Sequence, residues 1–240
     1  MKKLVRLDKY LADMNIGSRS EVKILIKKKK VKVNGDIAGK DNIKVDIEAD
    51  TVEVEGKKIE YTQYEYFMLN KPAGVVSATK DDNDRTVVDL IKDNTKDIFP
   101  VGRLDKDTEG LLILTNDGEL SHNLLSPKKH VDKKYYAKIS GIVGVEHIEQ
   151  FKNGLNINDE YITKEALLEV ISVDESKGMS EIYVTITEGK YHQVKRMFKA
   201  VGMEVIYLKR VAMGELKLDE NLELGKYRKL TTDELDRLKR

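Results

Sequence analysis

The segment VGRLDKDTEGLLILTNDG, residues 101–118, places three acidic side chains at alternate positions directly before an apolar run. The acids are Asp105, Asp107 and Glu109, and the run is LLILT at 111–115. A short apolar run bounded by polar residues indicates a buried strand. The acids therefore lie in a loop that leads into a buried strand, which is a rigid support for a functional carboxylate.

Two familiar kinds of acidic site fit this segment poorly. Its spacing begins like an EF-hand calcium loop, but the twelfth position, which needs a bidentate Glu, is Asn116, and the second half is apolar. We therefore expect no metal. A glycosidase needs two carboxylates on opposite sides of a sugar, which neighbours two apart on an extended chain do not by themselves supply. A paired-carboxylate hydrolase is the least favoured enzyme class.

The composition indicates a globular protein without disulfides. The chain has 240 residues, of which 40% are hydrophobic, and it contains no cysteine, so thiolate zinc sites and thiol nucleophiles are excluded. No apolar run approaches the roughly 18 residues of a membrane span, and charges interrupt the first fifteen residues where a signal peptide would be apolar. We expect a cytoplasmic monomer that does not contact membranes.

The net charge of +1 conceals an uneven distribution. Residues 1–32 contain 11 Lys or Arg against 3 Asp or Glu, whereas residues 33–60 contain 4 against 8. A compact module with one basic face is typical of proteins that bind a polyanion, and nucleic acid is the favoured partner.

The first sixty residues have the pattern of a small helical and β module. Apolar residues at helical spacing predict one helix that ends by Gly17, and SRSE from Ser18 predicts a capping box for a second helix. The Asn34-Gly35 pair predicts a hairpin between short strands. Four cations three or four residues apart are expected to share one face of the second helix and to bind RNA phosphates: Arg19, Lys23, Lys27 and Lys30.

Residues 6–35, RLDKYLADMNIGSRSEVKILIKKKKVKVNG, resemble the alpha-L RNA-binding module first known from a ribosomal small-subunit protein. That module accompanies many RNA enzymes and also occurs in non-catalytic ribosome-binding proteins. The resemblance implies an RNA substrate rather than a reaction. We assign the segment to an RNA-binding domain over residues 1–60.

Residues 61–240 are expected to form a second domain of longer strands and interspersed helices. Strands are expected at 64–70, 111–115, 134–140, 166–173 and 181–189. Helices are expected at 86–93, 118–126, 144–154, 192–202 and 231–240. The strands are too often consecutive for a doubly wound sheet, so the fold class is α+β with a mostly antiparallel mixed sheet.

The helix in EGKYHQVKRMFKAVG, residues 188–202, has an apolar face and a basic face. The basic face comprises His192, Lys195, Arg196 and Lys199, at i, i+3, i+4 and i+7. Taken alone, the pattern is that of an ordinary amphipathic helix with solvated cations.

Four motifs in their order along the chain resemble the RsuA/RluB family of ribosomal RNA pseudouridine synthases. They are YFMLNKPAG, VGRLDKDTEGLLILTNDGELSHNLLSP, KKHVDKKYYAKI and TEGKYHQVKRMFKAVG, and with the N-terminal module they span essentially the whole chain. The resemblance implies isomerisation of a specific uridine without a metal or organic cofactor. The spacing and the YHQVKRMF helix are most similar to members that act on small-subunit 16S rRNA.

The resemblance also implies roles for particular residues. Asp105 is the catalytic carboxylate, Tyr135 stacks on the uracil and can reach the C5 proton, and Lys195 is the cation that favours an ionised Asp105. Arg103, two residues before Asp105, fills the gap left by the flipped nucleotide or grips it. Lys71, His192, Arg196 and Lys199 complete the expected substrate-binding set, with Lys71 shaping the wall of the site rather than performing chemistry.

The remaining acids and the second tyrosine are assigned structural roles. Asp107 and Glu109 are expected to hold the loop. Tyr136 should point away from Tyr135 on a strand and pack in the core. The partner is ribosomal RNA, within an assembling small subunit by analogy. The alternatives are the same reaction on large-subunit 23S rRNA and a non-catalytic ribosome-assembly factor.

Overall fold

A computed structural model describes residues 3–92, 97–158 and 161–239. Positions 93 and 240, the last residues of two predicted helices, lie outside this description. The chain divides into two compact units, one formed by the described residues up to 65 together with 97, the other by 66–92 and 98–239. The assignment of 1–60 to RNA binding and 61–240 to catalysis stays a prediction. No helix of the described residues is long and apolar enough to cross a membrane.

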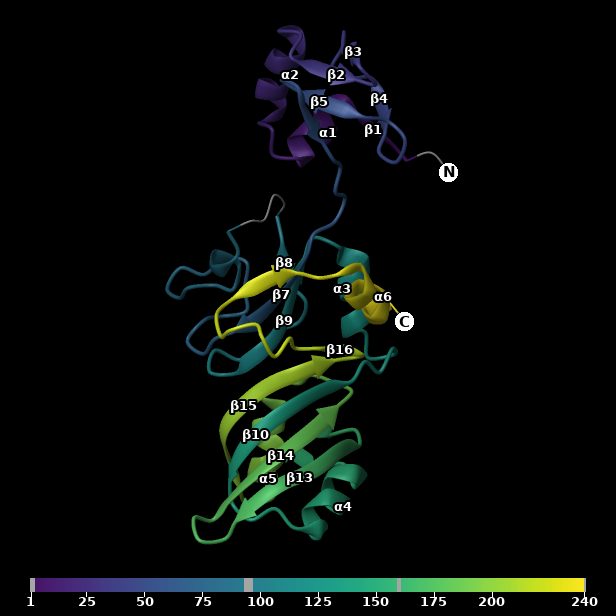
Figure 1. Ribbon diagram of the computed structural model, residues 1–240. Helices are drawn as coiled ribbons and strands as arrows, with labels where there is room; N and C mark the ends of the chain where they lie inside the picture. The colour runs from purple at the N-terminus through teal and green to yellow at the C-terminus, as the bar shows by residue number, and fades with distance from the viewer. Residues whose placement is uncertain (1–2, 93–96, 159–160, 240) are drawn as a thin grey trace. The chain divides into compact units, whose positions relative to one another are not determined.

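The smaller unit packs two helices against short strands (Figure 1). The helices are α1 (Leu7–Asp13) and α2 (Arg19–Lys27). One pair of strands is β1 (Leu4–Arg6) with β4 (Lys44–Asp46), and a four-stranded sheet has the order β3 (Asp36–Ile37), β2 (Val31–Val33), β5 (Val52–Val54), β6 (Lys57–Ile59). The core between them includes Leu7, Leu11, Val22 and Val31, each 0% exposed.

Two predictions from local sequence are confirmed in this unit. The capping box is present, because the Glu21 amide donates to the Ser18 hydroxyl at 3.3 Å and the Ser18 amide donates to the Glu21 carboxylate at 2.7 Å. The two-residue turn at Asn34 and Gly35 has φ angles of 53° and 88°, as a type I′ hairpin requires.

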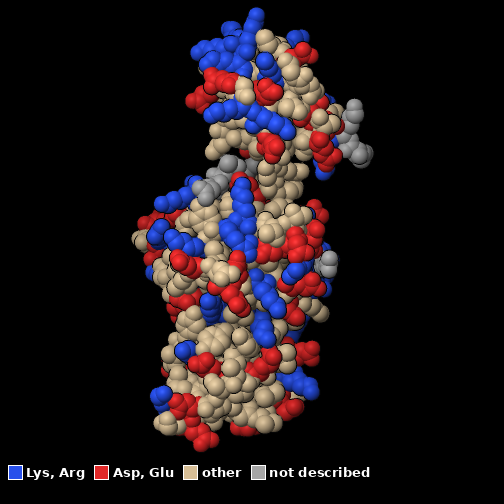
Figure 2. Space-filling model, viewed as in Figure 1, with Lys and Arg blue, Asp and Glu red and all other residues tan. Residues whose placement is uncertain are grey.

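The predicted basic face of α2 is wrong at Lys30. The helix ends at Lys27, and Lys29 adopts a φ of 57°, which turns the chain into β2. Lys30 therefore lies beyond the helix, where its ammonium pairs with Glu55. Arg19, Lys23 and Lys27 are on the helix and exposed, and Figure 2 shows Lys and Arg side chains gathered around α2.

The larger unit is built on one mixed sheet. Its strands run in the order β13 (Ala166–Asp174), β14 (Met179–Ile186), β10 (Lys133–Ser140), β15 (Glu204–Met213), β9 (Glu109–Thr115), β7 (Tyr66–Lys71), β17 (Tyr227–Lys229). Two short strands join its sides, β16 (Leu216–Lys217) on β15 and β8 (Phe99–Pro100) on β9. All neighbours are antiparallel except β15 and β9. This confirms the predicted α+β class with a mostly antiparallel mixed sheet.

Helices cover this sheet, and a small hairpin lies apart from it. The helices are α3 (Gly118–Leu125), α4 (Val145–Asn153), α5 (Gln193–Ala200) and α6 (Thr232–Lys239), and the hairpin is β11 (Asn156–Asn158) with β12 (Tyr161–Ile162). The helix predicted at 86–93 is wrong, because the described part contains only the 3-10 turn η1 (Val88–Leu90). Thr86, at its start, donates from its backbone to Asp89, and the chain is already extended at Ile91.

Strand β9 explains the apolar run of the opening segment. Alternate residues face two different cores: Leu112 and Leu114 lie in one, Leu111 and Ile113 in the other. All four are 0% exposed. A strand buried on both faces loses the polar alternation of a half-exposed one.

The parallel junction of β9 with β15 brings two backbones unusually close. Gly110 has a φ of +102°, and a Cβ at this position would meet the carbonyl oxygen of Arg210 well inside van der Waals contact. Only glycine fits there. The loop that carries Asp105 therefore enters β9 at a point where β9 packs tightly against β15.

Candidate active site

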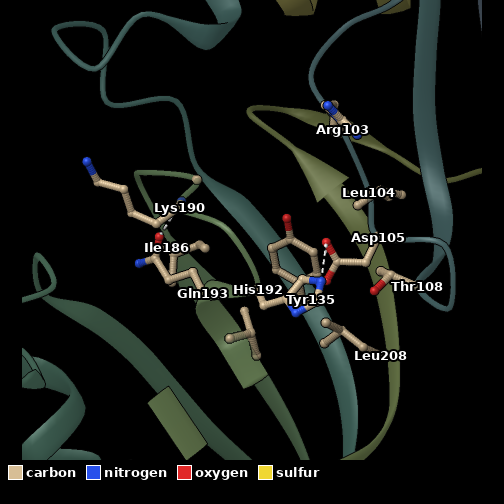
Figure 3. Close-up of a pocket in the computed structure, with 12 residues that line it drawn as sticks. Arg103, Leu104, Asp105, Thr108, Tyr135, Ile186, Lys190, His192, Gln193 and Leu208 are labelled. Carbon is tan, nitrogen blue, oxygen red and sulfur yellow. Dashed lines mark hydrogen bonds and ion pairs between the residues drawn. The ribbon is translucent and has the colours of Figure 1, made fainter. Parts of the chain in front are cut away.

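A pocket of about 70 Å³ lies where the loop before β9 faces β10, β15 and the start of α5. Figure 3 shows Asp105 and His192 facing each other, with the ring of Tyr135 next to them. The lining residues are Arg103, Leu104, Asp105, Thr108, Tyr135, Ile186, Gly189, Lys190, His192, Gln193, Val194 and Leu208. They come from four segments that are distant in the sequence.

The structure brings Asp105 together with two basic residues of the α5 segment. Lys195 Nζ lies 3.7 Å from one Asp105 carboxylate oxygen, and His192 Nε2 lies 3.6 Å from the other. The Asp105 side chain is 26% exposed, so the carboxylate is accessible to a substrate yet partly shielded from water. The predicted pairing of Asp105 with Lys195 is thus present as a long contact.

The shorter contact of Lys195 is with Asp107. Its Nζ donates to both Asp107 carboxylate oxygens, at 2.6 and 2.7 Å, and this hydrogen bonding is the main cause that lowers the pKa of Asp107. We expected Asp107 only to hold the loop. Its side chain instead points out of the loop to the cation that also faces Asp105.

The Lys71 side chain holds the backbone of the loop that carries Asp105. Its ammonium donates to the carbonyl oxygens of Pro72, Asp105, Lys106 and Thr108 at 2.8 to 3.3 Å, and the residue is 0% exposed. A fully buried side chain does not reach RNA, so its inclusion among the RNA contacts is wrong. The expectation that it shapes the site wall agrees with this geometry.

Further hydrogen bonds fix the same loop. The Ser77 hydroxyl donates to the Leu104 carbonyl at 2.8 Å and accepts from the Leu104 amide at 3.0 Å, and the Gly74 amide donates to the Lys106 carbonyl at 2.8 Å. Sequence reasoning missed Ser77, because an isolated serine between Val76 and Ala78 carries no signal of such a contact. The backbone on both sides of Asp105 is therefore held in place.

The two tyrosines of β10 face opposite sides of the sheet, as predicted. Tyr135 is 8% exposed and lines the pocket. Tyr136 is only half-buried and donates to Glu181 at 2.6 Å; burial and this hydrogen bond raise its pKa to about 12. The expectation that Tyr136 packs in the core is wrong, because its face of β10 is open to solvent.

The other predicted substrate contacts lie in different settings. Arg103 and Lys199 are exposed, and neither forms an ion pair within the described residues. Arg196 donates to the carbonyl of Ile157 at 2.9 Å and also contacts that of Tyr191 at 3.4 Å, so its guanidinium holds local backbone. His192 has a φ of 49° and stacks on the Tyr191 ring at 3.8 Å between ring centroids.

Several lining residues carried no functional signal in the sequence. Gln193 accepts from the Lys190 amide at 2.9 Å and donates to Glu188 at 2.7 Å, which shapes the turn before α5. The Thr108 hydroxyl is buried and has no hydrogen-bond partner among the residues that the structure describes. Among the described residues, no three His, Asp or Glu side chains lie close enough to hold a metal ion.

Comparison with known proteins identifies the family. The RNA pseudouridylate synthase profile matches residues 65–200, and the S4 domain profile matches residues 5–52. The chain is 49% identical to the uncharacterized RNA pseudouridine synthase YtzG of Bacillus subtilis, over 96% of this chain and 97% of that one.

Two further relatives are named for different ribosomal subunits. The chain is 44% identical to ribosomal large subunit pseudouridine synthase B of Bacillus subtilis, over 98% of this chain and 95% of that one. It is 40% identical to ribosomal small subunit pseudouridine synthase A of Vibrio cholerae, over 96% and 98%. A crystal structure of a pseudouridylate synthase matches 98% of this chain and 99% of its own, with a TM-score of 0.67 and 36% identity. The chain belongs to the RNA pseudouridylate synthase family and is a pseudouridine synthase of the RsuA/RluB type.

Proposed function

We propose that this protein converts a specific uridine of ribosomal RNA to pseudouridine, with Asp105 as the catalytic carboxylate. The observation that carries the proposal is the placement of Asp105. It lies at the pocket on a backbone held by Lys71, with two basic side chains within 3.7 Å. A preorganised, charge-balanced carboxylate is what a reaction at a sugar or base requires.

The reaction is an isomerisation, so it consumes and releases nothing. The bond from N1 to C1′ breaks, the uracil turns while it stays bound, C5 joins C1′, and the C5 proton is exchanged for one on N1. Asp105 acts at the sugar or base during this exchange. Lys195 supplies positive charge beside the carboxylate, and the His192 ring lies 3.6 Å from its other oxygen. Walls such as Leu104 and Leu208, which are 5% and 6% exposed, keep water from the reacting atoms.

Tyr135 is placed to hold the base. Its ring lines the pocket next to Asp105 (Figure 3). There it can stack on the uracil, and its hydroxyl can reach the proton at C5. Arg103 lies at the rim on the same loop, with its side chain exposed. We assign it to the gap left in the RNA when the target nucleotide turns out of its stack.

RNA is bound by cations in both units. The exposed α2 residues Arg19, Lys23 and Lys27 contact phosphates of the RNA, as does Lys199 on α5. Within this proposal the protein acts as a cytoplasmic monomer on RNA of an assembling small subunit.

The target we propose is a uridine of 16S rRNA. The motif spacing and the full-length similarity to small subunit pseudouridine synthase A, at 40% identity, support it. The 44% identity to large subunit pseudouridine synthase B favours 23S rRNA as the second candidate. Family motifs specify the reaction more closely than the target RNA, so an assay must distinguish 16S from 23S rRNA.

The test is an incubation of the purified protein with 16S and 23S transcripts and with partly assembled small subunits, followed by mapping of pseudouridine on each RNA. We expect one modified position in 16S rRNA and none when Asp105→Asn replaces the wild type. Modification of 23S rRNA alone would replace the proposed target with the second candidate. No modification of any RNA would contradict the proposed rRNA substrate.

A further inference from the structure

Asp107 and Lys195 form a close ion pair beside Asp105, although 88 positions separate them. The Lys195 ammonium lies 2.6 and 2.7 Å from the Asp107 oxygens but 3.7 Å from Asp105. Hydrogen bonds from an ammonium to a carboxylate have lengths of about 2.7 to 2.9 Å, so Asp105 receives the charge of Lys195 without a direct hydrogen bond. Within the part of the chain that the structure describes, Asp107 is the hydrogen-bond partner that fixes where that charge is.

Both backbones beneath this pair are held rigidly. On the loop side, Lys71 donates to the carbonyls of Asp105, Lys106 and Thr108. On the helix side, Met197 and Phe198 anchor α5 in the core, and both are 0% exposed. What remains free to move is the two side chains, and the long four-carbon stem of Lys195 has more rotatable bonds than the side chain of Asp107.

A lysine of this kind does not stay in place by itself. Fixing its side chain costs rotamer entropy, and the ammonium is strongly hydrated. The Lys195 side chain is 25% exposed, so water competes with the carboxylates for its ammonium. A short, two-oxygen contact from a fixed loop is what opposes that competition.

We infer that Asp107 is a positioning residue, which holds the Lys195 ammonium where its charge acts on Asp105 during pseudouridine formation. The inference rests on the proposed function. It assigns to Asp107 a task in the reaction that it performs through Lys195, without itself touching the substrate.

The charge of Asp107 gives this inference a distinctive signature. Its side chain is 72% exposed, two residues after Asp105 on the same loop. A carboxylate there repels phosphates, so its removal should leave RNA affinity unchanged or make it tighter. A residue that served RNA binding, or only loop stability, would not combine slower turnover with equal or tighter binding.

The experiment compares Asp107→Asn and Asp107→Glu with the wild type, and uses Asp84→Asn as the matched control. Asp84 pairs with exposed Lys106 at 2.6 Å in the adjoining loop, so its variant also loses a loop carboxylate and an ion pair, but not the contact to Lys195. Single-turnover rates at saturating rRNA and dissociation constants are measured separately. We expect Asp107→Asn to slow the reaction about tenfold or more, since small misplacements of a catalytic group are costly. Asp107→Glu should recover part of the rate, and Asp84→Asn should leave it nearly unchanged.

A spectroscopic measurement reports on the contact independently of activity. The measurement is the NMR signal of the Lys195 ammonium protons, assigned by its loss in Lys195→Arg. The signal should be visible in the wild type and in Asp84→Asn because hydrogen bonding slows the exchange of these protons with water. It should disappear in Asp107→Asn.

Three results would overturn the inference: an unchanged single-turnover rate in Asp107→Asn, equal slowing by Asp84→Asn, or a Lys195 signal that survives the loss of Asp107. An inactive wild type would instead count against the proposed function, while the Lys195 signal would still decide whether Asp107 holds that ammonium.

Discussion

Helices α2 and α5 both carry cations at helical spacing, and the structure gives the two sets different surroundings. Along α2, Arg19, Lys23 and Lys27 are exposed. Along α5, Lys195 is half-buried and faces Asp107 and Asp105, while Arg196 donates to the backbone. The difference teaches that spacing identifies a basic face, but groups from distant segments decide whether that face meets solvent or forms part of a site.

The contrast between the two helices follows from how exposed and half-buried lysines are solvated. An exposed lysine keeps its water and attracts a phosphate mainly through long-range charge, which salt screens. A half-buried lysine loses part of its water and must gain a carboxylate or carbonyl in exchange. In α5 these acceptors come from the loop before β9 and from Ile157, neither of which is near the helix in sequence.

The largest effect should come from the carboxylate that α5 faces. Asp105→Asn keeps the size of the side chain but removes its charge. We expect turnover to fall by at least about 10³-fold, as for other residues that act on the reacting bond. RNA affinity should stay within a few-fold. Single-turnover assays and filter binding measure the two quantities, and substantial turnover by this variant would remove Asp105 from the catalytic role.

The next effect compares two positions one turn apart on α5. Lys195→Met keeps most of the bulk but leaves Asp107 and Asp105 without their cation, so single-turnover rates at saturating RNA should fall about 10²-fold. Lys199→Met removes an exposed charge and should mainly weaken RNA binding. Lys195→Arg should retain part of the rate, since the charge survives although the geometry changes. Two methionine variants that behave alike would show that α5 is a uniform phosphate-binding face after all.

The basic face of α2 should produce a smaller, salt-dependent effect. Replacing Arg19, Lys23 and Lys27 together with Gln should weaken rRNA binding and flatten the plot of log affinity against log salt by about 0.7 to 0.9 for each phosphate that is no longer bound. Turnover at saturation should not change. Lys30→Gln is the comparison, because Lys30 lies beyond the helix and pairs with Glu55. On the helix, Lys23 also has an acidic partner, Asp41, at the longer distance of 3.3 Å. A slope that stays the same in the triple variant would mean that this face is only solvated.

Local features of the fold could be predicted because short-range chemistry determines them. The Ser18 capping box, the Asn34-Gly35 turn and the buried strand at 111–115 depend on neighbouring residues, and all three are confirmed. The helix expected at 86–93 is wrong, since its described part contains only a single 3-10 turn and the chain is extended at Ile91. The end of α2 was missed because three further lysines offer no stop signal, whereas the chain turns at Lys29 to reach β2.

The site was less accessible to sequence reasoning. Asp105 and Lys195 were brought together only through a family resemblance, and the structure shows that the short contact of Lys195 is with Asp107. The burial of Lys71 was also missed, because its four carbonyl partners are backbone atoms and leave no trace in side-chain pattern. Contacts between distant segments, or with main-chain atoms, have no local signature.

The smallest effect concerns Lys71, a lysine more deeply buried than any on α2 or α5. Burial lowers its pKa to about 8, against the attraction of Asp107, Asp105 and Glu109. This folded-state pKa lies below the unfolded value of 10.5. At pH values between these two pKa values the unfolded chain binds more protons than the folded chain. The contribution of Lys71 to stability therefore rises as the pH rises through that range. The free energy of unfolding of the wild type, relative to Lys71→Met, should therefore be larger at about pH 10 than at about pH 7.5 in urea titrations. Lys71→Arg is the control, because neither arginine nor methionine titrates in this range and their difference should be the same at both pH values. A wild-type difference that shrinks with pH would mean that the ammonium is stabilised, rather than disfavoured, among its carbonyl partners.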